Sequence, residues 1–290
     1  MTTATSSVRQ RNTRIVVVRR LVRAFAYLVL TVGGLAFILP FLLMVRTSLM
    51  TFGDLFADPP ILWPWPLIWQ NYVDMFNTGP YLHMLRNTVL IVFQNVLFET
   101  TSSVLVAYGF SRVRWEGRDK LFILVLATMM VPATVTLIPQ YAGFAWAGMV
   151  NTFWPLMIPR LFGHPFYIFI LRQYFLTLPK ELDEAAEMDG AGLWTTMTRV
   201  ILPLSKPAIA TVGVFSFVNH WNDFTEPLVY LLTAENQTLA LGLRWFIHNQ
   251  GTEYTWMMAA ATVFTGPMII AFFFAQKQFI RGIQLTGLKG

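Results

Sequence analysis

The sequence lacks several features on which common protein chemistries depend. It has no cysteine in 290 residues, which excludes disulfide bonds and cysteine-based metal or redox sites. It has no G-x-x-x-x-G-K-[ST] phosphate loop and no H-E-x-x-H zinc motif, and its four histidines are scattered. Charged residues make up only 12%, against about 25% in ordinary soluble domains. We therefore expect a membrane protein that is not an enzyme and binds no metal or nucleotide cofactor itself.

Long apolar runs account for most of the chain, and each approaches or exceeds the roughly 20 residues that a spanning helix needs. The six runs lie at residues 24–45, 87–111, 121–143, 152–171, 208–232 and 256–276. None of them alternates polar and apolar residues over about ten positions, as barrel strands do. The expected fold class is therefore an all-α integral membrane protein with six transmembrane helices. They form one transmembrane domain over 24–276, between terminal tails at 1–23 and 277–290.

The distribution of lysine and arginine predicts the orientation of these helices. Seventeen of the 21 basic residues fall in the first tail, the loop near 112–120, the segment 172–206 and the last tail. The opposite side holds Arg46, Arg86 and Arg244. Because cytoplasmic loops are enriched in basic residues, we expect both termini in the cytoplasm of a multi-pass cell-membrane protein. The net charge of +6 then reflects these loops and predicts no nucleic-acid partner. Residues 1–23 are expected to be disordered.

The segment 178–207 is the one long segment of the second half that is both charged and free of a spanning run. An acidic first turn after Pro179 favours a helix start, because proline and carboxylates suit the first turn of a helix. Gly190 and Gly192 offer a stop, since glycine readily takes the left-handed conformation that ends helices. A second helix is expected from about Leu193 to Ile201, until Pro203 and Pro207 break it. Each helix would be roughly 15 Å long, too short to span a bilayer.

Eight residues of this segment, at fixed spacing, resemble the EAA loop of permeases from ATP-binding-cassette (ABC) importers. They are Glu184, Ala185, Ala186, Asp189, Gly190, Ala191, Leu202 and Pro203. The one departure from the pattern is Val200, where isoleucine is usual. The resemblance implies that 178–207 is a coupling loop that docks on a cytoplasmic ATPase. It also implies that ATP and magnesium bind to the partner ATPase subunits and not to this chain.

Shorter matches extend the resemblance over most of the chain, from Asn87-Thr88 to the last residues, 279–290. They are similar to the second permease of maltose-type carbohydrate importers. The resemblance implies the type I permease fold, a homologous second permease subunit, two ABC ATPase subunits and an extracytoplasmic solute-binding protein. It further implies a sugar as the substrate.

Polar residues inside the apolar runs are candidate pathway groups, because burying them in a membrane is costly. Asn219, Asp223 and Glu226 are spaced four and three apart, which would place them on one helix face. Trp221 is expected to stack on a sugar ring, and its W-N-D-F run resembles carbohydrate permeases. The full candidate set is Glu99, Arg160, Asn219, Trp221, Asn222, Asp223 and Glu226. The alternative is that these groups bond between helices or to the partner subunit. Glu99 and Arg160 either pair across the bundle or set the substrate preference.

Two external loops are candidate partner surfaces. The first, residues 46–86, is rich in proline and tryptophan, and its tryptophans suit the membrane–water interface. Contact with an external partner is the alternative. The second loop spans 233–255, and the resemblance implies that it reaches toward a docked solute-binding protein. Its candidate contact residues are Arg244, Trp245, His248 and Asn249. A solvated connector is the alternative.

These features predict a permease subunit that forms, with a second permease, the pathway for a mono-, di- or oligosaccharide. The short helices of 178–207 would act as levers that switch the pathway between inward and outward access. One alternative keeps the ABC class but changes the cargo to a polyol, glycerol phosphate or peptide, and Arg160 keeps an anionic cargo open. Another is a stand-alone channel or secondary transporter in which 178–207 is only an interfacial hairpin.

Overall fold

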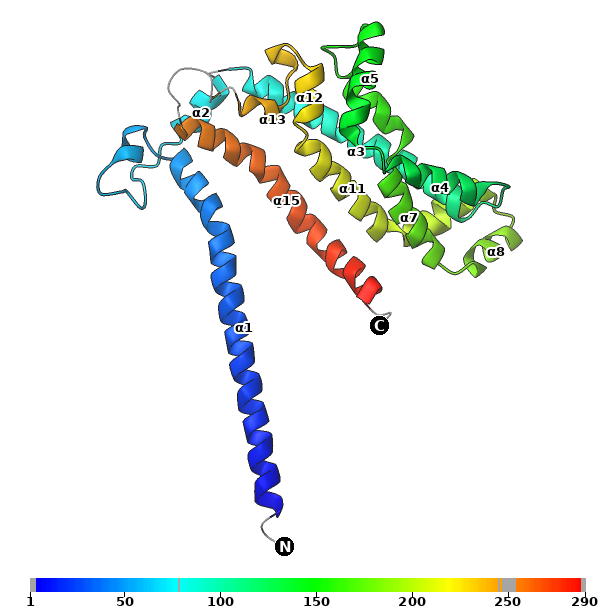
Figure 1. The fold of residues 1–290 in the computed structure, drawn as a ribbon, viewed down its shortest axis with the longest axis horizontal. Helices are drawn as coiled ribbons and strands as arrows, with labels where there is room; N and C mark the ends of the chain where they lie inside the picture. Colours follow the sequence, from blue (N-terminus) through cyan, green and yellow to red (C-terminus); the bar gives the residue numbers. More distant parts are fainter. Residues whose placement is uncertain (1–3, 78, 245, 247–253, 288–290) are drawn as a thin grey trace.

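The computed structural model describes residues 4–77, 79–244, 246 and 254–287, and within them it contains helices and turns but no strand (Figure 1). The longer helices are α1 (Ala4–Ser48), α2 (Gln70–Asn77), α3 (Tyr81–Ser111), α4 (Arg118–Thr128), α5 (Ala133–Trp146), α7 (Pro165–Thr177), α8 (Glu181–Met188), α11 (Lys206–Trp221) and α15 (Tyr254–Gly287). The short ones are η1 (Gly53–Phe56), α6 (Trp154–Met157), η2 (Ile158–Phe162), α9 (Leu193–Thr196), η3 (Met197–Ile201), α10 (Leu202–Leu204), α12 (Thr225–Tyr230), η4 (Ala234–Asn236) and α13 (Leu239–Gly242). The prediction of an all-α chain is confirmed.

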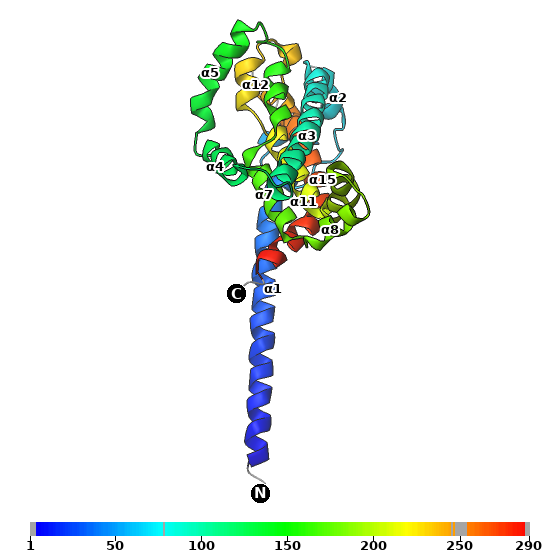
Figure 2. The same cartoon turned by 90° about the vertical axis from the view of Figure 1, so that its right-hand side faces the viewer.

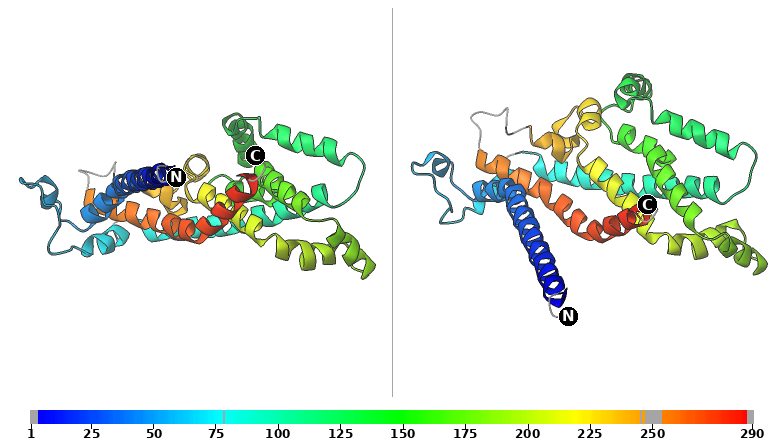
Figure 3. Two further views of the ribbon diagram at one scale, coloured as in Figure 1. Left: turned by 90° about the horizontal axis from the view of Figure 1, so that it is seen from below. Right: turned by 60° about the horizontal axis from the view of Figure 1, so that its bottom comes forward.

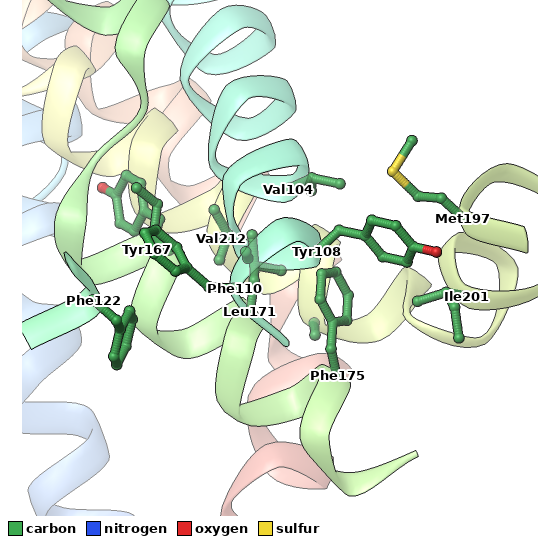
Figure 4. Packing of buried hydrophobic residues seen from close by; sticks show 13 residues of the cluster. Val104, Tyr108, Phe110, Phe122, Tyr167, Leu171, Phe175, Met197, Ile201 and Val212 are labelled. Atoms are coloured by element: carbon green, nitrogen blue, oxygen red, sulfur yellow. The ribbon is translucent and has the colours of Figure 1, made fainter. Parts of the chain in front are cut away.

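The bundle at the centre of the molecule consists of α3, α7 and α11, with α15 packed against α11. Its largest apolar core lies where α3, α4, α7, α11 and the α9–η3 segment meet, and Phe175, Leu171, Ile201 and Val212 are fully buried there (Figure 4). A second core joins α2, the start of α3, α13 and α15. α3 contributes to both cores and therefore connects the two ends of the molecule.

α1 stands apart from this bundle. It packs against α15 near the end at Ser48 and projects away from the other helices, as two perpendicular views show (Figures 1 and 2). Most of its described side chains are exposed, including Phe25, Leu35 and Phe37. Residues 4–23 are helical and not a disordered tail, because an apolar helix that has already formed extends into flanking residues at little cost.

Within the described residues, three helices are long and apolar enough to cross a membrane, namely Arg19–Ser48, Tyr81–Ser111 and Tyr254–Phe274. They coincide with three of the expected runs. Two more spans are possible if each of two bent helix pairs crosses once. These pairs are α4 with α5, bent by 92°, and Leu193–Leu204 with α11, bent by 80°. The count of six spanning helices therefore stays a prediction.

The expected run 152–171 is not one helix. It is divided into α6, η2 and the first half of α7. Gly163 between η2 and α7 has a φ of 78°, a left-handed conformation that interrupts a right-handed helix. Pro165 follows it in the first turn of α7, where a proline that lacks N–H is tolerated. The 13 residues of α7 extend about 20 Å, less than the hydrocarbon thickness of a bilayer.

The connection between α1 and α2, residues 49–69, contains η1, and we call it the η1 loop. It lies at the opposite end of the molecule from α8, and α3 runs between them (Figures 1 and 3). At the η1 end, Asn71 Nδ2 donates to the carbonyl oxygens of Ser48 (2.9 Å) and Met50 (2.8 Å), which fixes the loop to α2. Large apolar side chains of this loop, Leu62, Trp63 and Trp65, are exposed. The structure thus separates the expected external loop from the segment 178–207 by the length of α3.

Candidate functional site

The first candidate site is the helical hairpin at the α8 end of the molecule, and we refer to residues 180–204 as the docking segment. α8 begins directly after Lys180, and its first turn carries Glu181, Asp183 and Glu184. Carboxylates are favoured there by the positive end of the helix dipole. The second helix runs from Leu193 to Leu204. Two short helices therefore form this segment, as the sequence predicts.

Gly190 ends α8 through a specific backbone pattern. Its φ is 77°, its N–H donates to Glu187 O (2.9 Å), and the N–H of Ala191 donates to Ala186 O (2.9 Å). These two bonds form a Schellman motif, in which the left-handed residue is usually glycine. Gly192 has a φ of −77°, a conformation that does not require glycine. The prediction that a glycine stops this helix is confirmed, and the glycine is Gly190.

The second helix ends between Pro203 and Pro207, three residues later than the sequence predicts, because Pro203 itself does not break it. The helix contains a wider, π-helical turn at Met197–Ile201 and continues through Pro203 to Leu204. Proline has no N–H to offer the carbonyl four residues earlier, and such π turns are a usual way for a helix to accommodate an interrupted bond ladder. The bend falls at Ser205, whose N–H donates back to Ile201 O (3.0 Å).

The outer face of the docking segment combines carboxylates with large apolar side chains. Glu184 and Glu187 are exposed on α8. Beside the glycine turn, Met188 is 89% exposed, Trp194 66% and Leu193 61%. Sequence reasoning missed these three residues, although large apolar residues that flank a polar turn are themselves a signal of contact. Exposed carboxylates around an apolar edge suit docking against a partner that carries basic residues.

The inner face of the docking segment is fixed to the ends of α3 and α7. Met197 and Ile201 are buried in the same core as Tyr108 and Phe175, and the Tyr108 ring points toward their helix (Figure 4). The Tyr108 hydroxyl also donates to Leu193 O (3.2 Å). The segment is therefore packed on the helix bundle through its second helix.

A cleft of about 610 Å³ opens between the docking segment and the loop after α3. Its lining carries both signs of charge, with three arginines and Lys180 beside three carboxylates of α8. The arginines and carboxylates are those of Arg112, Arg114, Arg118, Asp183, Glu184 and Glu187. Such a cleft can receive a polar side chain of either charge from a docked partner.

The second candidate site is a buried polar cluster between α3 and α11. Glu99 is 1% exposed, and its Oε2 accepts hydrogen bonds from Ser216 Oγ (2.5 Å) and His220 Nε2 (2.9 Å). Asn95 Nδ2 lies 3.4 Å from His220 Nδ1 and donates to Leu156 O (3.2 Å). Glu99 was a candidate pathway residue, but in this conformation it joins two helices and faces no open space.

Arg160 pairs with Glu226 and not with Glu99. Its Nη2 donates to both carboxylate oxygens of Glu226, each at 2.7 Å. The side chains are 18% and 30% exposed, so the pair is partly accessible. It links η2, which follows the short helix α6, to α12, which follows the end of α11 at Trp221. The expected pairing of Glu99 with Arg160 across the bundle is therefore not found, and a role of either residue in substrate preference stays a prediction.

The expected single face of Asn219, Asp223 and Glu226 does not form. α11 ends at Trp221, so Asn219 lies in α11, Asp223 in the connection and Glu226 in α12. Asp223 Oδ1 accepts hydrogen bonds from the backbone N–H groups of Thr225 (3.1 Å) and Glu226 (3.3 Å). A carboxylate in that position competes with continued helix and starts a new one. Asp223 therefore shapes the backbone that presents Glu226.

Trp221 and Asn222 lie at the same break but in different surroundings. Trp221 is 3% exposed, and its Nε1 donates to Phe264 O (2.9 Å) in α15. Its ring stacks on Phe217, at 5.4 Å between centroids, so in this conformation it has no free face for a sugar. Asn222 is exposed, as is Asn219. Of the amides and the tryptophan proposed for the pathway, only the two amides are open to solvent.

The candidate partner residues of the second external loop fall mostly outside the described residues. Trp245, His248 and Asn249 are among those not described. Arg244 follows α13, and its guanidinium carbon lies 5.8 Å from the ring centroid of Phe224. Among the described residues, no group of three or more His, Asp and Glu side chains is arranged to hold a metal ion.

The sequence and the fold were compared with those of known proteins. Residues 99–285 match the model of a family described as "Binding-protein-dependent transport system inner membrane component". The chain is 32% identical over 228 residues to the arabinooligosaccharides transport system permease protein AraQ of Halalkalibacterium halodurans, covering 78% of this chain and 81% of that protein. It is 30% identical over 273 residues to the sn-glycerol-3-phosphate transport system permease protein UgpE of Yersinia pestis, covering 91% and 97%.

The fold is similar to a chain in the crystal structure of a bacterial ABC transporter involved in the import of the acidic polysaccharide alginate. The TM-score is 0.80 over 89% of this chain and 96% of that chain, at 22% sequence identity. This likeness concerns the fold.

Proposed function

The chain belongs to the family of binding-protein-dependent transport system inner membrane components, and from this membership we propose that it is the permease subunit of an ABC importer that forms a saccharide pathway with a second permease. The observation that carries the proposal is the docking segment. It is a short helical hairpin with an exposed apolar and acidic edge, fixed to the ends of α3 and α7. A subunit built in this way passes on motion that another protein generates.

In the proposed mechanism, two partner ATPase subunits bind ATP and magnesium and move the docking segments of both permeases. Trp194 and Met188 enter a hydrophobic groove of the ATPase, while Glu184 and Glu187 meet basic residues at its rim. Gly190 lets the chain turn sharply enough to present both helices at once. Since α8 is a rigid lever only two turns long, its displacement passes to the bundle, which alternates between inward and outward access.

The proposed orientation places the docking segment, the 1–23 tail and the 277–290 tail in the cytoplasm, and the η1 loop outside with the solute-binding protein. The positive-inside bias of the sequence supports it. So does the separation of the docking segment from the η1 loop at opposite ends of α3 (Figure 3). Under this orientation Arg244 and its neighbours in 233–255 face the docked binding protein. The permease domain, residues 24–276, crosses the membrane between the cytoplasmic and external sides.

An uncharged saccharide is the substrate that the described residues favour. Arg160 is the basic residue inside the apolar runs, and Glu226 neutralises it at 2.7 Å. Asp223 adds a second carboxyl group nearby. An anionic cargo would meet a net excess of carboxylates, whereas sugar hydroxyls can bond to the exposed Asn219 and Asn222. The similarity to AraQ, named for arabinooligosaccharides, supports the same class.

Glycerol phosphate is the second candidate cargo, and the specific observation that favours it is the 30% identity to UgpE over 91% of this chain. The two cargo classes differ in charge, so one experiment separates them. The chain would be reconstituted in proteoliposomes with its second permease, ATPase and binding protein. ATP-dependent uptake would then be measured for labelled arabinotriose, maltotriose and glycerol 3-phosphate.

Saturable uptake of a neutral saccharide that requires ATP and the binding protein supports the proposal. Uptake of glycerol 3-phosphate alone supports the second candidate. Uptake by the purified chain without ATP or ATPase would mean a stand-alone transporter and would contradict both.

A further inference from the structure

Arg112 holds a position that no described function accounts for. It is the first residue after α3, and its side chain is only 5% exposed although it carries a charge. Its guanidinium lies where three elements meet, namely the end of α3, the end of α7 and the first turn of α8. A buried charge at such a junction is stable only when it is paired and hydrogen-bonded.

The contacts of this guanidinium join α7 to α8. Nη1 forms an ion pair with Asp183 Oδ2 in the first turn of α8 and lies 3.4 Å from Pro179 O. Nη2 donates to the carbonyl oxygens of Phe175 and Leu178 (2.8 Å for Leu178) at the end of α7. The last carbonyls of a helix lack partners within it, and a cation is favoured there by the helix dipole. One side chain thus satisfies the end of one helix and fixes the start of the next.

α8 has few other attachments to the bundle. Ala186 is its one buried residue, and alanine contributes little apolar area. The second helix of the docking segment, in contrast, is held by Met197 and Ile201 in the core. Apart from the chain connection to α7 and its packing on α9 and η3, the position of α8 relative to α3 and α7 therefore depends on the Arg112 contacts.

From these contacts we infer that Arg112 is the positioning residue through which a displacement of α8 reaches α3 and α7. The inference rests on the proposed function, because it requires an ATPase that moves α8. The planar fork of an arginine bonds to a carboxylate and to backbone carbonyls at the same time, in a fixed geometry. A lysine keeps the charge but offers a single ammonium group, so Arg112→Lys should loosen the connection without removing the cation.

Arg172 provides a matched control in the same junction. It is similarly shielded, with a side chain 13% exposed, and Nε donates to Phe110 O (3.2 Å) at the end of α3. It also pairs with Asp119 (3.2 Å) and stacks on the Phe122 ring (4.1 Å). None of these contacts is to α8. Arg172→Lys therefore perturbs the junction to a similar degree without loosening the docking segment.

The test measures uptake and ATP hydrolysis together in the reconstituted importer, with the saccharide that the wild-type protein takes up. Arg112→Lys is expected to lower the amount of saccharide taken up per ATP hydrolysed at least about tenfold, while ATPase subunits still co-purify. Asp183→Asn, which removes the ion pair and keeps the backbone contacts, should lower the same ratio by about threefold. Arg172→Lys should leave it within twofold of wild type.

An unchanged ratio in assembled complexes of Arg112→Lys and Asp183→Asn would overturn the inference, even if their melting temperatures fell, since that pattern means a purely structural role. If Arg112→Lys does not assemble with the ATPase, the uptake per ATP of Asp183→Asn alone tests the inference. Failure of the wild-type protein to take up any saccharide with ATP would instead contradict the proposed function, so the two failures are distinguishable.

Discussion

Glu99 Oε2 accepts a hydrogen bond from His220 Nε2 at 2.9 Å, across the contact between α3 and α11. Because a carboxylate only accepts, the hydrogen belongs to His220 Nε2. Ser216 Oγ, one helical turn earlier in α11, donates to the same oxygen. A single carboxylate thus joins one helix to two successive turns of another inside the apolar bundle.

Replacing Glu99 by leucine should destabilise the bundle. The His220 N–H would lose its acceptor in a buried site, which costs about 1–3 kcal/mol. Glu99→Gln keeps an acceptor oxygen and should cost less. The measurement is the melting temperature of the detergent-purified permease pair, with uptake measured in parallel. Lost uptake at an unchanged melting temperature would show that Glu99 contacts the substrate in another conformation.

The turn between the two helices of the docking segment predicts a difference between two neighbouring glycines. Gly190→Ala places a Cβ at a φ of 77°, which costs about 1–2 kcal/mol for a left-handed residue. Gly192→Ala occupies an ordinary conformation, and no atom lies within 4 Å of the new Cβ. Saccharide uptake per ATP should therefore fall in Gly190→Ala, fall further in Gly190→Pro and remain normal in Gly192→Ala. Equal effects of both alanine variants would argue against a role for the turn.

The exposed indole of Trp194 should be a hot spot for the ATPase. Tryptophans at the centre of an interface often contribute about 2 kcal/mol or more, equivalent to roughly 30-fold in affinity. Trp194→Ala should weaken ATPase binding to the permease pair in nanodiscs by that factor. Trp146→Ala, at an indole that is 92% exposed at the end of α5, serves as the control. An identical Kd for the two variants would remove Trp194 from the interface.

The Arg160–Glu226 pair should show strong energetic coupling. Both side chains are mostly buried, and contacting residues in such pairs couple by about 0.5–3 kcal/mol. A double-mutant cycle with Arg160→Ala and Glu226→Ala, read from unfolding in detergent, should give about 1–2 kcal/mol. The cycle for Arg172 and Asp119 should give a clearly weaker coupling, because Asp119 is 68% exposed and its charge is screened by solvent. Coupling below that of the control pair would mean that Arg160 has another partner.

The orientation can be tested directly because the chain has no cysteine of its own. A membrane-impermeant maleimide should label Leu62→Cys in intact cells, since that side chain is 86% exposed at the η1 loop. Glu187→Cys in the docking segment should react only after the membrane is permeabilised. Labelling of Glu187→Cys in intact cells would place the docking segment outside and contradict the proposed function.

Local patterns allowed much of this structure to be predicted. The acidic first turn and Gly190 marked the limits of α8, because caps and left-handed turns depend on residues close in sequence. Three of the apolar runs are single long helices, since an apolar run is also a pattern of residues close in sequence. The break of 152–171 was missed, since apolar composition does not report a left-handed glycine such as Gly163.

The side-chain partners could not be predicted, because they join distant parts of the chain. Arg160 and Glu226 are 66 residues apart, and Glu99 and His220 are 121 apart. Spacing along one helix suggested a shared face for Asn219, Asp223 and Glu226, but the carboxylate of Asp223 starts a new helix between them. Trp221 resembled a sugar-stacking residue and is instead a buried contact with α15.

The length of α1 has a consequence for the lipid bilayer. The apolar part from Arg19 to Ser48 has 30 residues, about 45 Å of helix, whereas the hydrocarbon layer is about 30 Å thick. Such a rod has to lean or to extend into the headgroups, where Arg19, Arg20 and Arg23 meet anionic lipids. The tilt of α1 is therefore expected to vary with acyl-chain length within the limits set by its packing on α15, so this exposed helix is where the subunit adapts to the thickness of its bilayer.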